Sequence, residues 1–397
     1  MSPFSYTYSI PYVLFFICIC VLSIPLIEKN RESLLYQHIN FIQLSIFISL
    51  FIVFFGLRGY IYTDWASYYS FYQNCPSLLD NQYEIKKFIN NTSWESGFVI
   101  YTIICKTISA DYFFFQFISF TIDFIALFLI FKKLIPRHIM LGFIIFILFG
   151  GLSIEINLLR NSKSIICFML SLKYIESKSI FKFFALNIFG CLFHITSLLY
   201  LPLYFILNKT IPKKLLIILF ITGNIVYLFE IEWFRQILLL TSSFAPSRLE
   251  YLIEVYLSNK LYSSSYGLTL GFLERFISFL LIYKFSTSLC NIQKVNKIYI
   301  NSFFIYLFIF LYFSEMTILL ERIALLFVFS YWILFPQVFA LLSKTHKKIF
   351  FTALFYYGIA KLVMGHHNII TLYDNVLFSY KSFSERLFLL TKHANKI

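Results

Sequence analysis

Two charged side chains lie among aromatic ones in the stretch GLRGYIYTDWASYYSFY, which runs from Gly56 to Tyr72. Aromatic rings combine an apolar face with a polar edge, so such a cluster suits the C–H faces and hydroxyl groups of a sugar. Arg58 brings a permanently charged fork of donors, and Asp64 brings a carboxylate that can accept a proton. An aromatic belt at a membrane interface is the alternative explanation for the rings alone. The rings that we predict to bind sugar are Tyr60, Trp65, Tyr68, Tyr69 and, in a later segment, Tyr251.

Basic side chains in further segments have the chemistry of an anion-binding site. In EINLLRNSKS, Arg160 and Lys163 lie three residues apart and share one face if the segment is helical. A helix that begins near them presents free backbone N–H groups, which commonly bind phosphate. Local pairing with a neighbouring acid is the alternative, as for Arg322 beside Glu321. The arginines for which we expect a shared anionic ligand are Arg58, Arg160, Arg235, Arg248, Arg275 and Arg322.

Two residues outside these segments could accept a proton. His194 divides the long apolar stretch 181–207, and a polar residue between apolar half-spans is by default a candidate for function. Histidine titrates near neutrality and can take a proton from a hydroxyl group, although a hydrogen bond across a helix pair would also explain it. Glu95 lies just before a short helix expected at 98–109, where the helix dipole favours an anion. Together with Asp64, these two residues are the candidate catalytic groups.

The elements that carry these residues must be membrane-spanning helices. The chain of 397 residues is 59% apolar and 13% charged, with a mean hydropathy of +0.78, whereas a soluble domain is about 25% charged. That composition excludes a soluble enzyme, a disordered chain and a nucleic-acid-binding domain, and the continuous apolar runs exclude an outer-membrane barrel. We therefore predict an all-α polytopic membrane protein with about 11–13 transmembrane helices. Besides 181–207, the apolar runs lie at 11–27, 40–57, 113–131, 139–154, 163–177, 214–229, 268–284, 298–313, 322–342 and 349–365.

The distribution of charge predicts which side of the membrane each loop faces. Lys and Arg collect in a set of loops that the positive-inside rule places in the cytoplasm. This assignment requires that 181–207 turns back at His194, because one continuous span would place every later basic loop outside. The outer side of a single membrane domain, 1–397, then holds the loops 58–97 and 230–267, the second with an amphipathic helix at 247–257. The basic loops are 28–38, 132–138, 173–182, 208–214, 284–297 and 343–348.

Motifs for metals and nucleotides are missing from the sequence. It contains no GxxxxGK[ST] phosphate loop, so ATP-driven transport by this chain is not expected. It has no HExxH, no DxD near an outer loop, and no CxxC or Cys/His cluster among its seven cysteines. We therefore expect no metal and no cofactor. The net charge of +14 is explained by the basic loops, so nucleic acid is not an expected partner.

An ordered set of motifs resembles that of EpsG-like proteins, a branch of the Wzy-type bacterial polysaccharide polymerases. The longest is G-L-R-G-Y-x-x-T-D-W-x-x-Y-Y-x-F at 56–71. Ser164 departs from the family pattern, in which alanine is common at this place. The remaining motifs are W-E-x-G-F at 94–98, L-R-N-x-K-S at 159–164, F-H-I-T-S-L-L-Y-L-P-L-Y at 193–204, E-R-I at 321–323 and L-Y-D-N at 372–375.

The resemblance implies a glycosyltransferase of the GT-C kind that joins lipid-linked oligosaccharide repeat units on the outer face of the bacterial plasma membrane. The growing glycan would leave undecaprenyl pyrophosphate and pass to an acceptor repeat unit by inverting, metal-independent transfer. Its partners would be undecaprenyl-pyrophosphate-linked oligosaccharides, membrane lipid and a protein that regulates chain length. The residues expected to bind the pyrophosphate are Arg160 and Arg322 first, then Arg58 and Arg248, with Lys163 beside them.

Two other functions fit part of the pattern. An O-antigen ligase would use related chemistry but would transfer the glycan to lipid A core. A transporter or flippase of lipid-linked sugars would also have outer arginines, but it should carry polar residues deep in several spans. A sugar O-acyltransferase would place Arg and His in its first spans, and the first two apolar runs, 11–27 and 40–57, contain neither residue.

Overall fold

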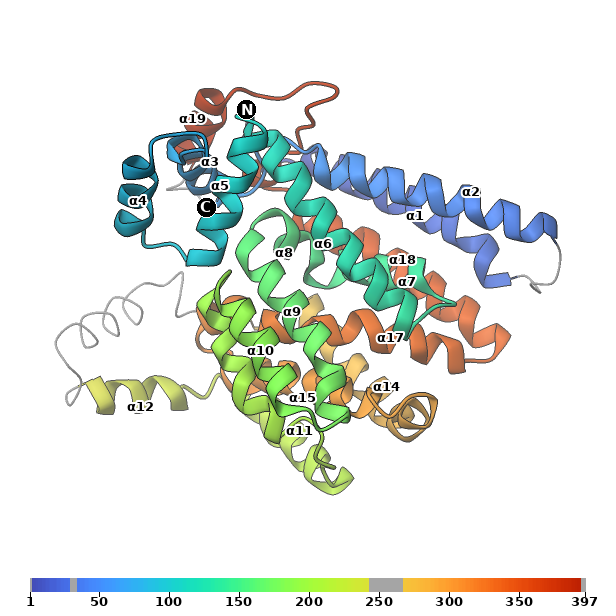
Figure 1. Ribbon diagram of the computed structural model, residues 1–397. Helices are drawn as coiled ribbons and strands as arrows, with labels where there is room; N and C mark the ends of the chain where they lie inside the picture. The colour runs from blue at the N-terminus through green and yellow to red at the C-terminus, as the bar shows by residue number, and fades with distance from the viewer. Residues whose placement is uncertain (1, 29–33, 243–266, 394–397) are drawn as a thin grey trace. The chain divides into compact units, whose positions relative to one another are not determined.

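The computed structural model describes residues 2–28, 34–242 and 267–393, and its regular structure in these ranges is helical (Figure 1). No β-strand occurs in these ranges, although isolated bridges join Phe4 to Asn368 and Arg58 to Asn375. The chain is therefore an all-α polytopic membrane protein, as its composition predicts. The amphipathic helix expected at 247–257 lies outside the described residues.

Four helices within the described ranges are long and apolar enough to cross a bilayer: Tyr6–Ile24, Tyr112–Leu134, Ile139–Ile156 and Lys344–Gly365. The pair Lys213–Leu228 and Trp233–Leu240, bent by 80°, would make a fifth span if it crosses as one broken helix. The total of 11–13 spans stays a prediction. The shorter apolar helices are Phe41–Gly56, Ser96–Ile108, Ile180–Cys191, Ile195–Phe205, Asn296–Tyr312 and Phe329–Leu341.

The chain folds into two compact units. Residues 1–174, 179–201 and 335–397 form the first, and residues 175–178 and 202–334 form the second. The single membrane domain, 1–397, that the sequence predicts stays a prediction. The first unit contains most of the predicted site residues.

Phenylalanine rings hold the long helices of the first unit together. α2 (Leu34–Phe51) lies beside α1 (Ile10–Glu28) in Figure 1 and continues into a π-helical turn, Ile52–Gly56. Phe51 packs on Phe143 of α7 (Ile139–Phe146), with ring centroids 5.1 Å apart. Phe55 stacks on Phe120 of α6 (Tyr112–Leu134) at 5.1 Å. The aromatic stretch that starts at Gly56 therefore begins at a turn that is fixed by the packing of phenylalanine rings.

The predicted loop 58–97 consists largely of short helices. α3 (Trp65–Asn74) and α4 (Gln82–Asn91) lie within it, and α5 (Ser96–Ile108) follows directly (Figure 1). At 1.5 Å per residue, the 13 residues of α5 extend about 20 Å, which is too short for a hydrocarbon core of about 30 Å. Its length therefore agrees with the short helix expected at 98–109.

The chain reverses direction at His194, as the charge distribution requires. α10 (Ile180–Cys191) ends just before this residue, and a 3-10 helix, Ile195–Phe205, begins just after it. Phe168 of α9 (Leu159–Glu176) contacts both sides of the break, because its ring centroid lies 6.3 Å from that of Phe183 and 3.7 Å from that of Tyr200. A straight helix would separate those two partners by about 25 Å. The turn at His194 is thus a property of the fold.

The second unit is built on a helical hairpin, α14 (Leu270–Ile292) and α15 (Asn296–Tyr312), against which α11 (Lys213–Leu228) packs. Glu315 accepts hydrogen bonds from the N–H groups of Phe234 and Arg235 in the first turn of α12 (Trp233–Ser242). The carboxylate therefore caps this helix. α16 (Thr317–Arg322) also belongs to this unit. α17 (Phe329–Leu341) begins in it and continues into residues 335–397 of the first unit, which include α18 (Lys344–Gly365).

Candidate active site

A cleft of about 330 Å³ opens in the first unit where three of the motifs meet. The start of α3 forms one wall, the residues before α5 form another, and the first turn of α9 supplies a guanidinium group. The residues that line the cleft are Asp64, Ser67, Tyr68, Ser93, Trp94 and Arg160.

Arg160 is held in the cleft by an acid and an aromatic ring. Its Nη1 lies 2.5 Å from Oε2 of Glu95, and its Cζ lies 4.4 Å from the ring centroid of Trp94. The hydroxyl of Tyr68 lies within interaction range of the same guanidinium. Burial raises the pKa of that phenol above its ordinary value, so the hydroxyl stays protonated at neutral pH and can donate a hydrogen bond.

Trp94 is itself fixed by neighbouring rings. Phe71 of α3 stacks on it with centroids 4.3 Å apart and an interplanar angle of 5°. Phe98 of α5 stacks at 5.4 Å, and Tyr68 meets its edge at 5.3 Å. Because the indole is packed between α3 and α5, the cation–π contact restricts the orientation of the guanidinium. The cleft therefore contains a preorganised cation, the arrangement that stabilises developing negative charge.

Glu95 joins three of the sequence motifs. One carboxylate oxygen pairs with Arg160, and the other accepts the N–H of Ile195, 3.2 Å away, immediately after His194. The N–H of Phe98 donates to the carbonyl of Leu192 at 3.0 Å. A Cβ on Gly97 would lie 2.6 Å from Cβ of Leu192, so only glycine allows this approach. W-E-x-G-F, L-R-N-x-K-S and F-H-I-T thus come together around one carboxylate.

Asn157 positions Asp64, the residue that brings a carboxylate to the cleft lining. Its Oδ1 accepts the N–H groups of Thr63 at 3.2 Å and Asp64 at 2.9 Å. Asn157 lies between α8 (Leu152–Ile156) and the start of α9, so one side chain ties the T-D-W segment to the helix that carries Arg160. Sequence reasoning missed this residue. Its place in EINLLRN, three residues before Arg160, was the available signal.

A family model described as the EpsG family matches residues 41–382 of the chain, a range that includes every residue lining the cleft. The chain belongs to the EpsG family. No curated protein and no solved structure matches it. The resemblance read from the motifs is therefore confirmed at the level of the family.

In this EpsG family member, Arg58 lies in the interior and away from the cleft lining. Its side chain is 1% exposed and donates to the carbonyl oxygens of Phe55 and, at 3.1 Å, Glu155. Its own carbonyl accepts Nε2 of Gln116 at 2.5 Å. A guanidinium engaged with helix-end carbonyls stabilises the entry to the aromatic stretch, and its role toward pyrophosphate stays a prediction that the geometry does not strengthen.

Lys163 lies one turn from Arg160 but does not line the cleft. Its Nζ contacts both carboxylate oxygens of Asp123 in α6, at 3.0 and 3.2 Å, and the two side chains are 7% and 3% exposed. Ser162 hydrogen-bonds the buried carboxylate of Glu155 in the same region. The structure therefore brings Arg160 and not Lys163 to the cleft.

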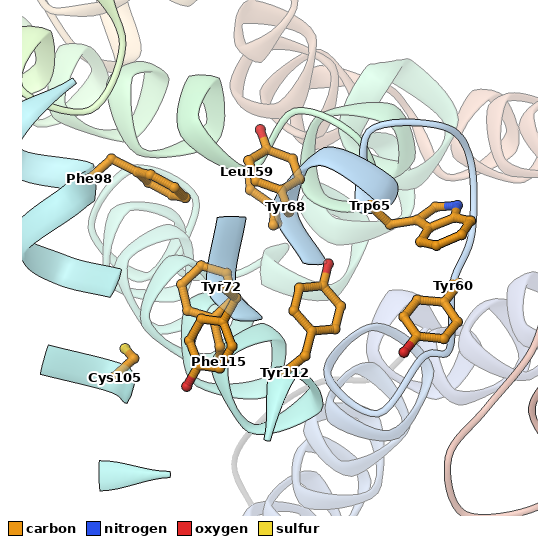
Figure 2. Packing of buried hydrophobic residues seen from close by; sticks show 9 residues of the cluster. All are labelled: Tyr60, Trp65, Tyr68, Tyr72, Phe98, Cys105, Tyr112, Phe115 and Leu159. Atoms are coloured by element: carbon orange, nitrogen blue, oxygen red, sulfur yellow. The ribbon is translucent and has the colours of Figure 1, made fainter. Parts of the chain in front are cut away.

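Three of the aromatic residues expected to bind sugar, Tyr60, Trp65 and Tyr68, belong to a packed core (Figure 2). Tyr60 and Trp65 are 4% and 2% exposed, and their rings lie 4.7 Å apart. Tyr69 packs partly buried against the same cluster, and of these rings only Tyr68 lines the cleft. The cluster, which shares Tyr68 with the cleft lining, contains Tyr60, Trp65, Tyr68, Tyr72, Phe98, Cys105, Tyr112, Phe115 and Leu159.

The remaining predicted residues lie elsewhere. His194 stands at the reversal of the chain, where its Nδ1 lies 2.8 Å from the hydroxyl of Thr196 and accepts the Thr196 N–H at 3.2 Å. Arg322 is exposed at the end of α16 in the second unit. Arg248 and Tyr251 lie outside the described residues. Within the described ranges, no group of three His, Cys, Asp or Glu side chains could hold a metal ion.

Proposed function

We propose that this EpsG family member is a polysaccharide polymerase of the GT-C kind that acts on the outer face of the bacterial plasma membrane. It would transfer a growing glycan from undecaprenyl pyrophosphate to an acceptor repeat unit, itself carried on undecaprenyl pyrophosphate. The observation that carries the proposal is Arg160, held by Glu95 and Trp94 at the edge of a cleft that also presents hydroxyl groups and a carboxylate.

The cleft supplies the two functions that the transfer needs. A hydroxyl oxygen of the acceptor sugar attacks the anomeric carbon, and the bond from that carbon to the pyrophosphate oxygen breaks with inversion. The electron pair leaves with the pyrophosphate, whose new negative charge Arg160 stabilises, with Tyr68 as a hydrogen-bond donor. The hydroxyl proton passes to a base. No step calls for a metal or a nucleotide.

The geometry favours Asp64 as that base. It is the carboxylate in the lining of the cleft, where its Oδ1 accepts the Thr63 hydroxyl at 3.2 Å, whereas the two oxygens of Glu95 bind Arg160 and the Ile195 N–H. His194 stays a rival, although its Nδ1 already accepts the backbone N–H of Thr196 at 3.2 Å. Glu95 is then a positioning residue that fixes the guanidinium.

Purified protein in detergent should extend lipid-linked repeat units into a ladder of longer glycans without added nucleotide or metal. We expect Arg160→Ala to abolish the ladder. The matched control is Arg137→Ala, which removes an exposed arginine in the loop between α6 and α7. A ladder that survives Arg160→Ala would overturn the proposed role of the cleft.

Two further variants assign the base. The identity of the acceptor distinguishes a polymerase from a ligase. Loss of the ladder in Asp64→Asn with retention in His194→Ala supports Asp64, and the opposite result moves the base to His194. Transfer to lipid A core instead of a second lipid-linked unit would identify a ligase. Absence of any transfer by folded protein with authentic substrate would favour a transporter.

A further inference from the structure

The C-terminal helix α19 (Phe383–His393) begins just after the residues that the EpsG family model matches. A reciprocal cap defines its start. The N–H of Glu385 donates to Oγ of Ser382 at 3.3 Å, and the N–H of Ser382 donates to the Glu385 carboxylate at 2.8 Å. The carboxylate also accepts the Ser382 hydroxyl at 2.9 Å, and the hydrogen bonds that it accepts from the N–H and the hydroxyl of Ser382 lower the pKa of Glu385. The helix therefore has a local reason to begin where it does.

One face of α19 packs on the aromatic cluster that shares Tyr68 with the cleft lining. Phe383 stacks on Tyr69 with ring centroids 4.3 Å apart, and its ring meets those of Trp65 at 5.5 Å and Tyr60 at 6.1 Å. Leu387, four residues on, packs against the same cluster, as does Leu390. Positions 383, 387 and 390 share a helix face, so the contact is continuous along α19.

Arg386 ties the same helix to the segment that precedes it. Its side chain is 1% exposed, and its Nη2 donates to the carbonyls of Ile370 at 2.9 Å and Leu372 at 2.8 Å. Two residues further on, the carbonyl of Asp374 accepts the N–H of Gly59 at 2.8 Å. α19 is thus connected through this segment to the beginning of the aromatic stretch.

The two sides of α3 meet different partners. Trp65 and Tyr69, four residues apart, contact Phe383. Ser67 and Tyr68 line the cleft, together with Asp64 at the N-cap. Because a short helix moves as a unit, a shift of the face that contacts α19 must also shift the cleft wall.

We propose that Phe383 is a positioning residue and that α19 is a brace for the cleft. By packing on Trp65 and Tyr69, it holds Asp64 and Tyr68 in place opposite Arg160. The part of this inference that concerns the reaction rests on the proposed function, whereas the part that concerns the order of α3 does not. Phe383, Trp65 and Tyr69 do not line the cleft, so the effect of this contact should appear in the turnover rate.

Hydrogen–deuterium exchange of full-length protein in detergent tests the brace without any substrate. Phe383→Ala should make the amides of α3 exchange about tenfold faster while those of α9 stay unchanged. The control is Phe388→Ala, because Phe388 is on the same helix but is 61% exposed. Unchanged protection of α3 in folded Phe383→Ala would overturn the proposal. If that variant does not fold, Leu387→Ala is measured against the same control and decides in the same way.

The polymerisation assay separates positioning from general stability. We expect Phe383→Ala to lower kcat by about tenfold or more with little change in KM, because a small misplacement of reacting groups is costly. Phe383→Leu, which keeps apolar volume, should recover part of that loss, and Phe388→Ala should match the wild type. Equal kcat in Phe383→Ala and wild type would overturn the role in the reaction. If even the wild type forms no glycan, the proposed function fails while the exchange experiment still decides the brace.

Discussion

Arg160 and Lys163 lie one turn apart on α9, and each pairs with an acid from another helix or loop, yet their surroundings differ. The side chains of Arg160 and Glu95 are 26% and 18% exposed beside the cleft, whereas those of Lys163 and Asp123 are 7% and 3% exposed. An ion pair in contact with water gains little from its Coulomb attraction and can exchange partners. A buried pair must stay intact, because either charge alone would be costly.

The comparison shows that one helix carries two cations with different partners and different exposure to water. Arg160 keeps a planar fork accessible to an anionic ligand while Glu95 and Trp94 restrict its orientation. Lys163, a compact charge, is used within the protein to fix α9 against α6. Under the proposed function the first pair takes part in the chemistry, whereas the second fixes α9 against α6.

The largest expected effect is on stability and comes from the buried pair. Lys163→Met leaves the Asp123 carboxylate buried without its cation, and we expect a loss of about 3–5 kcal/mol in the free energy of unfolding. Thermal denaturation in detergent measures it. The double variant Lys163→Met/Asp123→Leu should recover most of the loss, because both charges are then removed. If Lys163→Met were as stable as the wild type, the two ion pairs would not differ in their contribution to stability.

Arg160→Ala should have the opposite profile. Turnover should fall by about 10²–10³-fold, since a preorganised cation is lost, while the free energy of unfolding should change by less than about 1 kcal/mol. Single-turnover kinetics and thermal denaturation of one preparation give both values. A loss of stability as large as that of Lys163→Met would mean that Arg160 is mainly structural.

Arg160→Lys sharpens the comparison, because it places the residue type of the buried pair in the cleft. The charge is kept, but the planar fork and its stacking on Trp94 are lost. We expect a decrease in turnover of about tenfold, between the wild type and Arg160→Ala. Activity equal to the wild type would indicate that charge alone matters at this position.

The smallest expected effect concerns Trp94, whose ring contacts the guanidinium of Arg160. Trp94→Leu removes the cation–π contact, which is worth about 1 kcal/mol and corresponds to about fivefold in turnover. Trp94→Phe keeps an aromatic face, so its turnover should decrease less than that of Trp94→Leu. Steady-state rates for the two variants check the order, and a greater loss in Trp94→Phe would contradict it.

Much of the architecture follows from the sequence because it depends on local pattern. Long apolar runs with little charge require membrane-spanning helices, and they predict the all-α fold correctly. The positive-inside rule located the reversal at His194, since only a turn there keeps the later basic loops on one side. Among the candidate site residues, the cleft includes Asp64, Tyr68 and Arg160, and Glu95 pairs directly with Arg160.

What the sequence could not determine is the environment that each face of a helix meets. The spacing of Arg160 and Lys163 places them on one face, but the buried partner of Lys163 is Asp123, forty residues away on α6. The same holds for Arg58, which donates to the carbonyl of Glu155, and for Tyr60 and Trp65, which the packing of α3 and α19 makes core residues.

Residue type and helical period thus determined which side chains could do chemistry and which would lie together on an element. Only the tertiary structure decided which of them faces a cleft and which is buried. The physical reason is that the energy of a charge or a ring depends on the water and the partners around it. Here Trp94, Asn157 and Phe383, which come from three separate parts of the chain, provide those partners for Arg160, Asp64 and Tyr69.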